Sequence, residues 1–142
     1  MKVDTPRWGA IEIDPATVIH FETGLAGFPE CSDFIVMDHD RSTPLKWLQC
    51  IDTPGLSFVI IEPEQILASY TVDVPEPVMK KIGWNGDVNP SDVAVFVILN
   101  CDGENLTANL RAPVVVNVKE RRAIQLILDD PNIPLRHPIS PQ

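Results

Sequence analysis

The sequence of 142 residues has few cysteines, and none of them are paired in a known motif. Cys31, Cys50 and Cys101 are odd in number and widely spaced, and no C-x-x-C occurs. Neither a zinc knuckle nor a thioredoxin-type redox pair is therefore indicated. Because free cysteine packs like a small hydrophobe, we expect reduced and mostly buried thiols.

Long apolar runs are also absent. No stretch approaches the roughly 20 apolar residues that a membrane-spanning helix needs. The first residues, MKVDTP, lack the apolar core of a secretory signal. These two absences predict a cytoplasmic protein that makes no contact with a membrane.

Basic residues are scarce, with 11 Lys and Arg against 20 Asp and Glu and a net charge of −9. Binding of bare RNA or DNA depends on clustered Lys and Arg, so direct nucleic-acid binding is not expected. An acidic protein is suited to a basic protein partner, because its field raises the encounter rate. Most acidic surfaces, however, do no more than keep a protein soluble.

Motifs of catalysis are missing too. The sequence has no G-x-S-x-G, P-loop or H-E-x-x-H, so neither an enzyme nor a cofactor is indicated. Asp38-His39-Asp40 is the sharpest metal-like cluster, since carboxylate and imidazole bind zinc or iron. In an extended chain His39 points away from the two aspartates, and we interpret the cluster as a solvated turn without a metal.

The chain is instead rich in proline and in short β-type segments. Fourteen prolines punctuate it, which favours many short strands over long helices. Runs of β-branched and aromatic residues predict strands at 7–13, 18–21, 34–37, 45–51, 57–61 and 93–99. The run 93–99 has no polar face, so we expect it to be covered on both sides.

Two short helical turns are predicted between residues 63 and 83. Proline is tolerated at the first helical position, which allows one turn over 63–67. The segment 75–83 is a better helix, because Val78 and Ile82 share a face, acids lead, lysines follow and Gly83 can cap the end.

Residues 93–128 predict an antiparallel meander. An Asp-Gly turn at 102–103 follows the first strand, Ala112-Pro113 breaks the second segment, and a charged tip at 119–122 joins the last two strands. The predicted fold is mostly β, a small antiparallel β-barrel or compact sandwich with one or two short helices. We expect a single domain over 1–142 with a proline-rich tail at about 131–142.

Gly24-Leu25-Ala26-Gly27 matches the G-x-x-G pattern of an RNA backbone clamp. Glu22 and Glu30 flank it, and their charge would repel phosphate. The clamp is therefore disfavoured, and we interpret the glycines as a sharp bend between two strands. A second interpretation makes the loop a partner surface with Leu25 and Phe28 as exposed anchors.

From about Gly9 to Ile139 the chain resembles the FliW family of bacterial flagellar assembly factors. The motifs that carry the resemblance are Gly9-x-Ile11-x-Ile13, Ile19-x-Phe21-Glu22-x-Gly24-Leu25-x-Gly27-Phe28, Leu48-Gln49-Cys50-Ile51-Asp52, Asn109-Leu110-x-Ala112-Pro113-Val114-Val115-Val116-Asn117, Gln125-x-Ile127-Leu128 and Arg136-His137-Pro138-Ile139. The sequence departs from the family pattern at Glu62-Pro63 and at the tip Glu120-Arg121-Arg122, which lacks a glycine often found there.

The resemblance implies a small β-barrel-like protein without a catalytic task. FliW proteins bind CsrA, a small RNA-binding dimer that represses translation, and they also bind flagellin. Secretion of flagellin then frees FliW to antagonise CsrA. The resemblance thus implies CsrA and flagellin as partners, and a chaperone-like role in coupling flagellin synthesis to flagellar assembly.

Three sets of residues are predicted to bind partners. Glu62, Glu64 and Glu76 belong to a stretch without a base between Lys46 and Lys80 and are candidates to meet a positive surface. Leu25 and Phe28 are the apolar candidates, and Arg136 and His137 are those of the tail. Two alternatives remain open: a small-molecule-binding β-barrel without catalytic activity, and a hydrolase with a site built from scattered acids.

Overall fold

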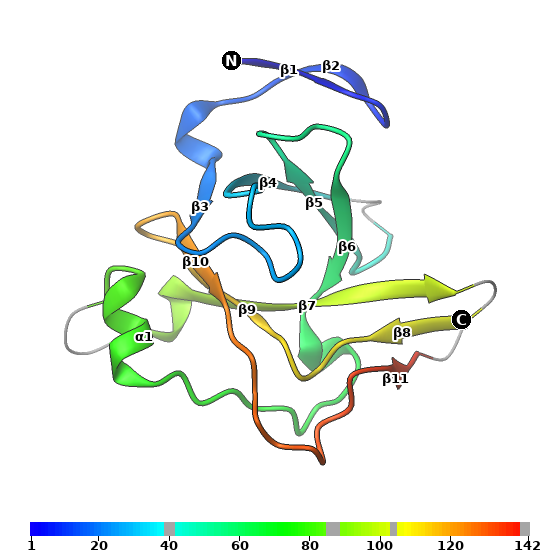
Figure 1. The fold of residues 1–142 in the computed structure, drawn as a ribbon, viewed down its shortest axis with the longest axis vertical. Coiled ribbons are helices and arrows are strands. Elements are labelled where there is room, and N and C mark those ends of the chain that lie inside the picture. Colours follow the sequence, from blue (N-terminus) through cyan, green and yellow to red (C-terminus); the bar gives the residue numbers. More distant parts are fainter. Residues whose placement is uncertain (39–41, 85–88, 103–104, 140–142) are drawn as a thin grey trace.

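Seven strands close into a barrel in the computed structural model (Figure 1), which describes residues 1–38, 42–84, 89–102 and 105–139. In order around the described barrel they are β3 (Ile19–Phe21), β4 (Asp33–Asp38), β5 (Lys46–Cys50), β6 (Ser57–Ile61), β7 (Val93–Asp102), β9 (Val114–Asn117) and β10 (Arg122–Gln125). The predicted barrel is confirmed, and the sandwich alternative is not.

One pair in the barrel departs from the expected antiparallel arrangement. β10 lies parallel to β3, with Arg122 opposite His20 and Ala123 opposite Phe21. The other neighbours around the described barrel are antiparallel. A closed ring with an odd number of strands cannot alternate direction throughout, so one parallel pair is required.

β7 is ten residues long and serves two partners on the same edge. Its first half pairs with β9 and its second half with β8 (Asn105–Ala108). The predicted meander is therefore wrong in one respect, because β8 pairs with β7 and not with β9. As predicted, the chain is interrupted at Ala112-Pro113, between β8 and β9. The expected Asp-Gly turn falls at residue 103, outside the described residues.

Short elements at both ends of the chain lie outside the barrel. β1 (Lys2–Thr5) and β2 (Gly9–Glu12) form a hairpin, where the sequence predicted one strand over 7–13. A buried cluster of Val3, Ile13 and Ile35 joins this N-terminal region to β4. β11 (His137–Pro138) pairs with β8 in the tail, and two single turns, η1 (Pro15–Thr17) and η3 (Pro90–Asp92), complete the connections.

The helical turns occur where the sequence predicts them. η2 (Pro63–Gln65) and α1 (Glu76–Lys81) both begin with a proline in their first turn, and Gly83 ends α1 with φ +92°. Ile82 and Trp84 pack against the outer face of the barrel, and Asn117 donates from Nδ2 to the Ile82 carbonyl at 2.8 Å. None of the described helices is long and apolar enough to cross a membrane.

Aromatic and aliphatic side chains fill the barrel. Phe21 and Phe34 belong to the inner cluster, with their ring centroids 4.9 Å apart, and the partly buried Phe58 packs against it. Cys31 and Cys50 are buried among them as free thiols, and Cys101 is exposed. Burial, with a hydrogen bond to Cys31, raises the pKa of Cys50 to about 12. The Cys50 thiol is structural, because so high a pKa keeps its thiolate scarce.

Candidate functional site

The loop between β3 and β4 is a tight bend, as the sequence predicted. Gly24 and Gly27 take φ of +70° and +86°, a region that favours glycine. The Phe28 N–H donates to the Leu25 carbonyl at 2.8 Å, which closes a four-residue turn. Positive φ at the third position is what a type II turn requires.

The burial of this loop corrects one expectation. Leu25 is only 2% exposed and belongs to the inner barrel cluster, so it is not an exposed anchor. Phe28 is half-buried, and its ring lies edge-on to Phe58 with centroids 5.3 Å apart. The loop thus folds inward and its apolar residues complete the mouth of the barrel.

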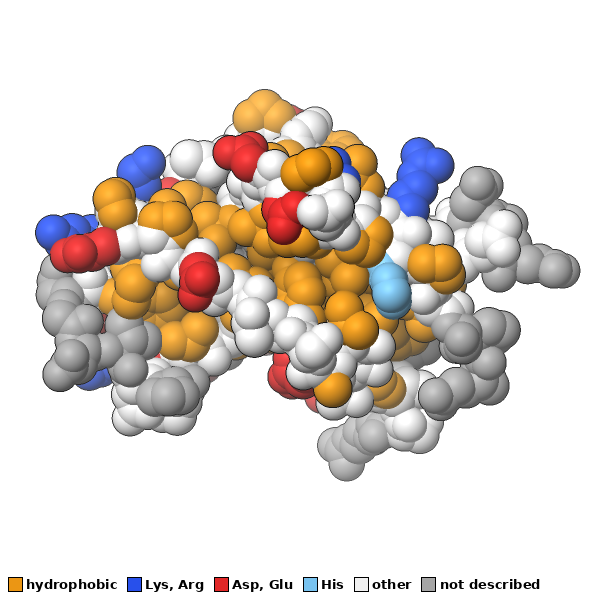
Figure 2. All heavy atoms as spheres, turned by 90° about the horizontal axis from the view of Figure 1, so that it is seen from below, with side chains coloured by type: hydrophobic (Ala, Val, Ile, Leu, Met, Phe, Trp, Pro, Cys, Tyr) orange, Lys and Arg blue, Asp and Glu red, His pale blue; other side chains and the backbone are white. Residues whose placement is uncertain are grey.

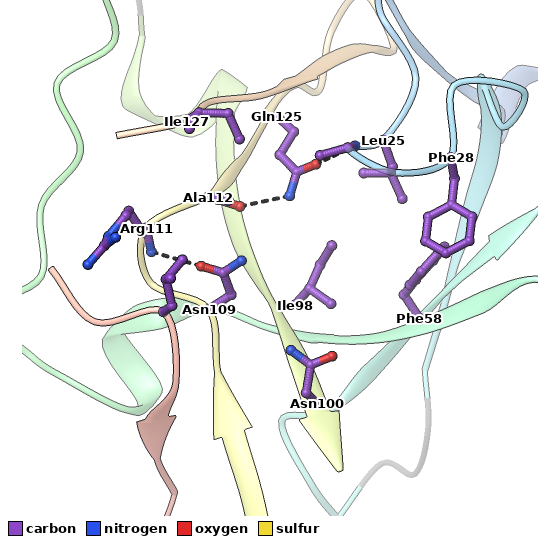
Figure 3. Close-up of a pocket in the computed structure, with 12 residues that line it drawn as sticks. Leu25, Phe28, Phe58, Ile98, Asn100, Asn109, Arg111, Ala112, Gln125 and Ile127 are labelled. Carbon is purple, nitrogen blue, oxygen red and sulfur yellow. Dashed lines mark hydrogen bonds between the residues drawn. The ribbon is translucent and has the colours of Figure 1, made fainter. Parts of the chain in front are cut away.

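An open groove of about 280 Å³ lies at this mouth, and we call it the barrel-mouth groove (Figure 3). It runs between the bent loop, the middle of β7 and the segment after β10. Most of its lining is apolar or uncharged: Leu25, Ala26, Phe28, Phe58, Ile98, Asn100, Asn109, Arg111, Ala112, Gln125, Ile127 and Leu135. Seen from below, the molecule also gathers apolar side chains in the middle of one face (Figure 2).

Gln125 holds one wall of the groove together. Its Oε1 accepts the Ala26 N–H at 2.9 Å, and its Nε2 donates to the Ala112 carbonyl at 3.1 Å (Figure 3). One side chain therefore ties the bent loop to the interruption between β8 and β9. The motif Gln125-x-Ile127-Leu128 contained this residue, but nothing in the motif indicated that its side chain bridges two loops.

Arg111 connects the groove to the tail. Its Nε donates to the Ile133 carbonyl at 2.8 Å and its Nη2 to the Pro131 carbonyl at 3.1 Å. Both bonds fix the tail against the barrel. The guanidinium is therefore engaged within the chain, and the groove offers little charge to a ligand.

The predicted acidic residues divide into two places. Glu62 and Glu64 lie beside each other at η2, where the hydrogen bond from Glu64, together with burial, raises the pKa of Glu62. Glu76 begins α1 and lies 3.6 Å from the Lys80 ammonium. The chain between them passes beneath the barrel from the end of β6 to α1 (Figure 1). We name the first pair the η2 acidic pair.

The tail candidates lie beside β8. His137 in β11 is opposite Ala108, and the following Ile139 N–H donates to the Leu106 carbonyl at 2.9 Å. Arg136 is exposed just before β11. Binding of a partner by Arg136 and His137 stays a prediction.

Metal ligands do not gather in the described part of the chain. No group of three or more His, Cys, Asp or Glu converges there. Asp38 ends β4 and accepts from the Lys46 ammonium at 2.8 Å. The remainder of the cluster considered above, His39 and Asp40, lies outside the described residues.

Together these features define a small closed β-barrel protein with an open groove at the barrel mouth. The model of the FliW protein family matches residues 2–139. The flagellar assembly factor FliW of Caldanaerobacter subterraneus subsp. tengcongensis is 36% identical over 140 residues, covering 98% of this chain and 93% of the relative. That of Thermoanaerobacter pseudethanolicus is 35% identical with the same coverage.

The fold agrees with the sequence comparison. A crystal structure of the flagellar assembly factor FliW superposes with a TM-score of 0.88 at 35% identity, covering 99% of this chain and 98% of the other. The chain belongs to the FliW family of flagellar assembly factors.

Proposed function

We propose that this protein works in the cytoplasm by binding the translational repressor CsrA, which it antagonises, and by binding flagellin. Membership of a flagellar assembly factor family carries the proposal. In this role the chain performs no catalysis. It couples flagellin synthesis to assembly because flagellin and CsrA draw on the same pool of the protein.

The charge of the chain supports an RNA-binding protein as a partner. CsrA must present a positive surface to RNA, and the net charge here is −9, so attraction speeds their encounter. The η2 acidic pair is the best candidate to face that surface. The hydrogen bond from Glu64 and burial raise the pKa of Glu62, and the negative charge of Glu64 adds to the shift. An approaching cation favours the charged form of both carboxylates.

The small-molecule-binding alternative is less well supported. Buried side chains of the inner cluster, among them Phe21 and Phe34, occupy the barrel where a ligand-binding barrel keeps its cavity. The barrel-mouth groove is open by comparison, and suits a protein surface better than an enclosed ligand.

A competition titration tests the proposal. A preformed complex with CsrA is titrated with monomeric flagellin while a fluorescent label on CsrA reports its release. We expect flagellin to release CsrA and the freed CsrA to regain RNA binding. The proposal fails if neither protein binds the chain at micromolar concentration. If both bind at once without release, the two activities exist but are not coupled.

A further inference from the structure

After β10 ends at Gln125, the backbone continues to make strand-like hydrogen bonds on one edge only. The Leu126 N–H donates to the Pro113 carbonyl at 2.9 Å, and the Leu128 N–H donates to the Arg111 carbonyl at 2.8 Å. Residues 126 and 128 thus direct their backbone groups toward 111–113. Because backbone groups alternate along an antiparallel ladder, those of Gln125 and Ile127 face the opposite edge.

On that opposite edge β3 is the neighbouring strand, and the pairing stops where β3 ends. The last bond between the two segments runs from the Glu22 N–H to the Ala123 carbonyl at 3.1 Å. The chain then bends away at Gly24, and the Gln125 side chain takes the Ala26 N–H. Within the described residues the backbone N–H of Ile127 makes no hydrogen bond. Beyond the end of β3, the edge of residues 125–128 therefore has no neighbouring strand among the described residues.

This edge borders an apolar surface. Ile127 is 62% exposed and lines the barrel-mouth groove together with Phe28 and Phe58. A second hollow between the bent loop, Gln125 and Ile127 continues the groove along the same edge. Among the described residues that line the two hollows, Arg111 is the one charged side chain, and its donors already serve the tail.

We propose that this edge binds an extended, uncharged segment of a partner protein as an added strand. The segment pairs with the free backbone groups of Ile127, and every second side chain, apolar in type, enters the barrel-mouth groove. Main-chain bonds supply affinity and the groove supplies selectivity, as in other strand-addition complexes. An uncharged groove does not suit the positive surface expected to face the η2 acidic pair.

A display experiment with hydrogen exchange tests the edge directly. Random dodecapeptides displayed on phage are selected against the full chain, and the enriched peptides are synthesised. We expect alternating apolar residues in them. Binding should slow exchange of the Ile127 amide by tenfold or more. Ile127→Pro removes the free donor while keeping the bonds of 126 and 128, and should weaken peptide binding by at least tenfold.

Matched variants distinguish binding at this edge from non-specific hydrophobic binding. Ile127→Asp places a charge in the groove and should abolish peptide binding, whereas Val118→Asp, on an exposed apolar residue of the β9–β10 turn, should leave it unchanged. Peptides that bind without protecting the Ile127 amide would overturn strand addition even if Ile127→Pro fails to fold. Protection of that amide by self-association of the chain alone would replace the partner segment with a second copy.

Discussion

The guanidinium of Arg122 binds the carboxylate of Glu22 with Nε and Oε1 2.7 Å apart, although 100 residues separate them in the chain. Arg122 also donates through Nη2 to the Lys81 carbonyl at the end of α1. One side chain therefore joins the bent loop, the helix and the parallel strand pair that closes the barrel.

This ion pair predicts a pH-dependent contribution to stability. The hydrogen bond from Arg122 lowers the pKa of Glu22 in the folded protein. Its stabilisation is complete above the unfolded pKa of about 4.3 and is lost as pH falls through the lower folded value. Glu22→Gln should cost about 0.5–1 kcal/mol near neutral pH and nothing in strong acid.

Thermal melts across that pH range check the prediction, with Glu30→Gln as the control. Glu30 is an exposed acid of the same loop, and its replacement should leave the melting temperature unchanged. A Glu22→Gln penalty that stays constant down to the lowest pH would show that the carboxylate charge is not what stabilises the fold.

The two glycines of the bent loop should differ in their tolerance of alanine. A Cβ at Gly24 would lie 2.9 Å from the Pro29 carbonyl oxygen, whereas one at Gly27 meets nothing within 4 Å. Both have positive φ, so Gly27→Ala should cost about 1 kcal/mol and Gly24→Ala about 2–3 kcal/mol. Gly55→Ala, with open space and no positive φ, should change stability by less than about 0.5 kcal/mol. Urea denaturation of the three variants gives the order, and equal costs at Gly24 and Gly27 would rule out the contact with Pro29.

Replacement of Arg121 by glycine should increase the stability of the fold. Arg121 is the one non-glycine residue of positive φ among the described residues, at +57°, and sits in the charged tip between β9 and β10. Arg121→Gly should stabilise the fold by about 0.5 kcal/mol, since relief of backbone strain exceeds the added entropy of the unfolded chain. Lys119→Gly in the same tip, without a positive φ to relieve, should destabilise it. Chemical denaturation compares the two variants. A loss of stability in both would show that the positive φ of Arg121 does not strain the backbone.

Charge reversal should show that the η2 acidic pair contributes more than Glu76 to the rate of association with CsrA. Replacing Glu62, Glu64 and Glu76 together with lysine should slow association with CsrA about tenfold at low salt and flatten its salt dependence. Most of the effect should come from Glu62→Lys with Glu64→Lys, because Glu76 is already partnered by Lys80. Stopped-flow rates at two salt concentrations decide this, with flagellin binding as the control. Unchanged rates in the triple variant would move the CsrA surface elsewhere.

Deletion of residues 135–142 should weaken partner binding or solubility and leave the β signal in circular dichroism. The deletion removes β11 and the bond from Ile139 to Leu106, but none of the barrel strands. Calorimetric titration of the truncated chain with both partners measures the effect. Unchanged affinity and solubility would make Arg136 and His137 part of an ordinary terminus.

Local patterns in the sequence predicted most of the strands and both main helical turns. Runs such as Ser57–Ile61 and Val93–Leu99 are dense in β-branched residues, and Gly83 follows α1 as a cap. β1 was missed because Lys2–Thr5 is four residues long and ends beside a proline. β11 was missed because His137-Pro138 is a strand only through its pairing with Ala108 and Thr107, a contact that no local pattern records.

The candidate site was less predictable for the same reason. Leu25 appears exposed in sequence because a glycine bend surrounds it, yet the loop folds inward and buries it. The bridge that Gln125 makes and the unpaired edge at Ile127 depend on the relative position of segments about 100 residues apart. Such relationships follow from how the barrel closes and not from residue type or spacing.

The closing pair between β3 and β10 also sets when the protein can finish folding. Residues 19–21 receive their partner only after residues 122 and 123 have been made, and at about 5–20 residues per second the early strands wait roughly 5–20 seconds on the ribosome. Contacts of such long sequence separation also slow refolding of the full chain. Until then the edge of β3 stays open to other chains. A nascent molecule therefore passes through a window in which it is vulnerable to misassembly, and the last quarter of the chain brings that window to an end.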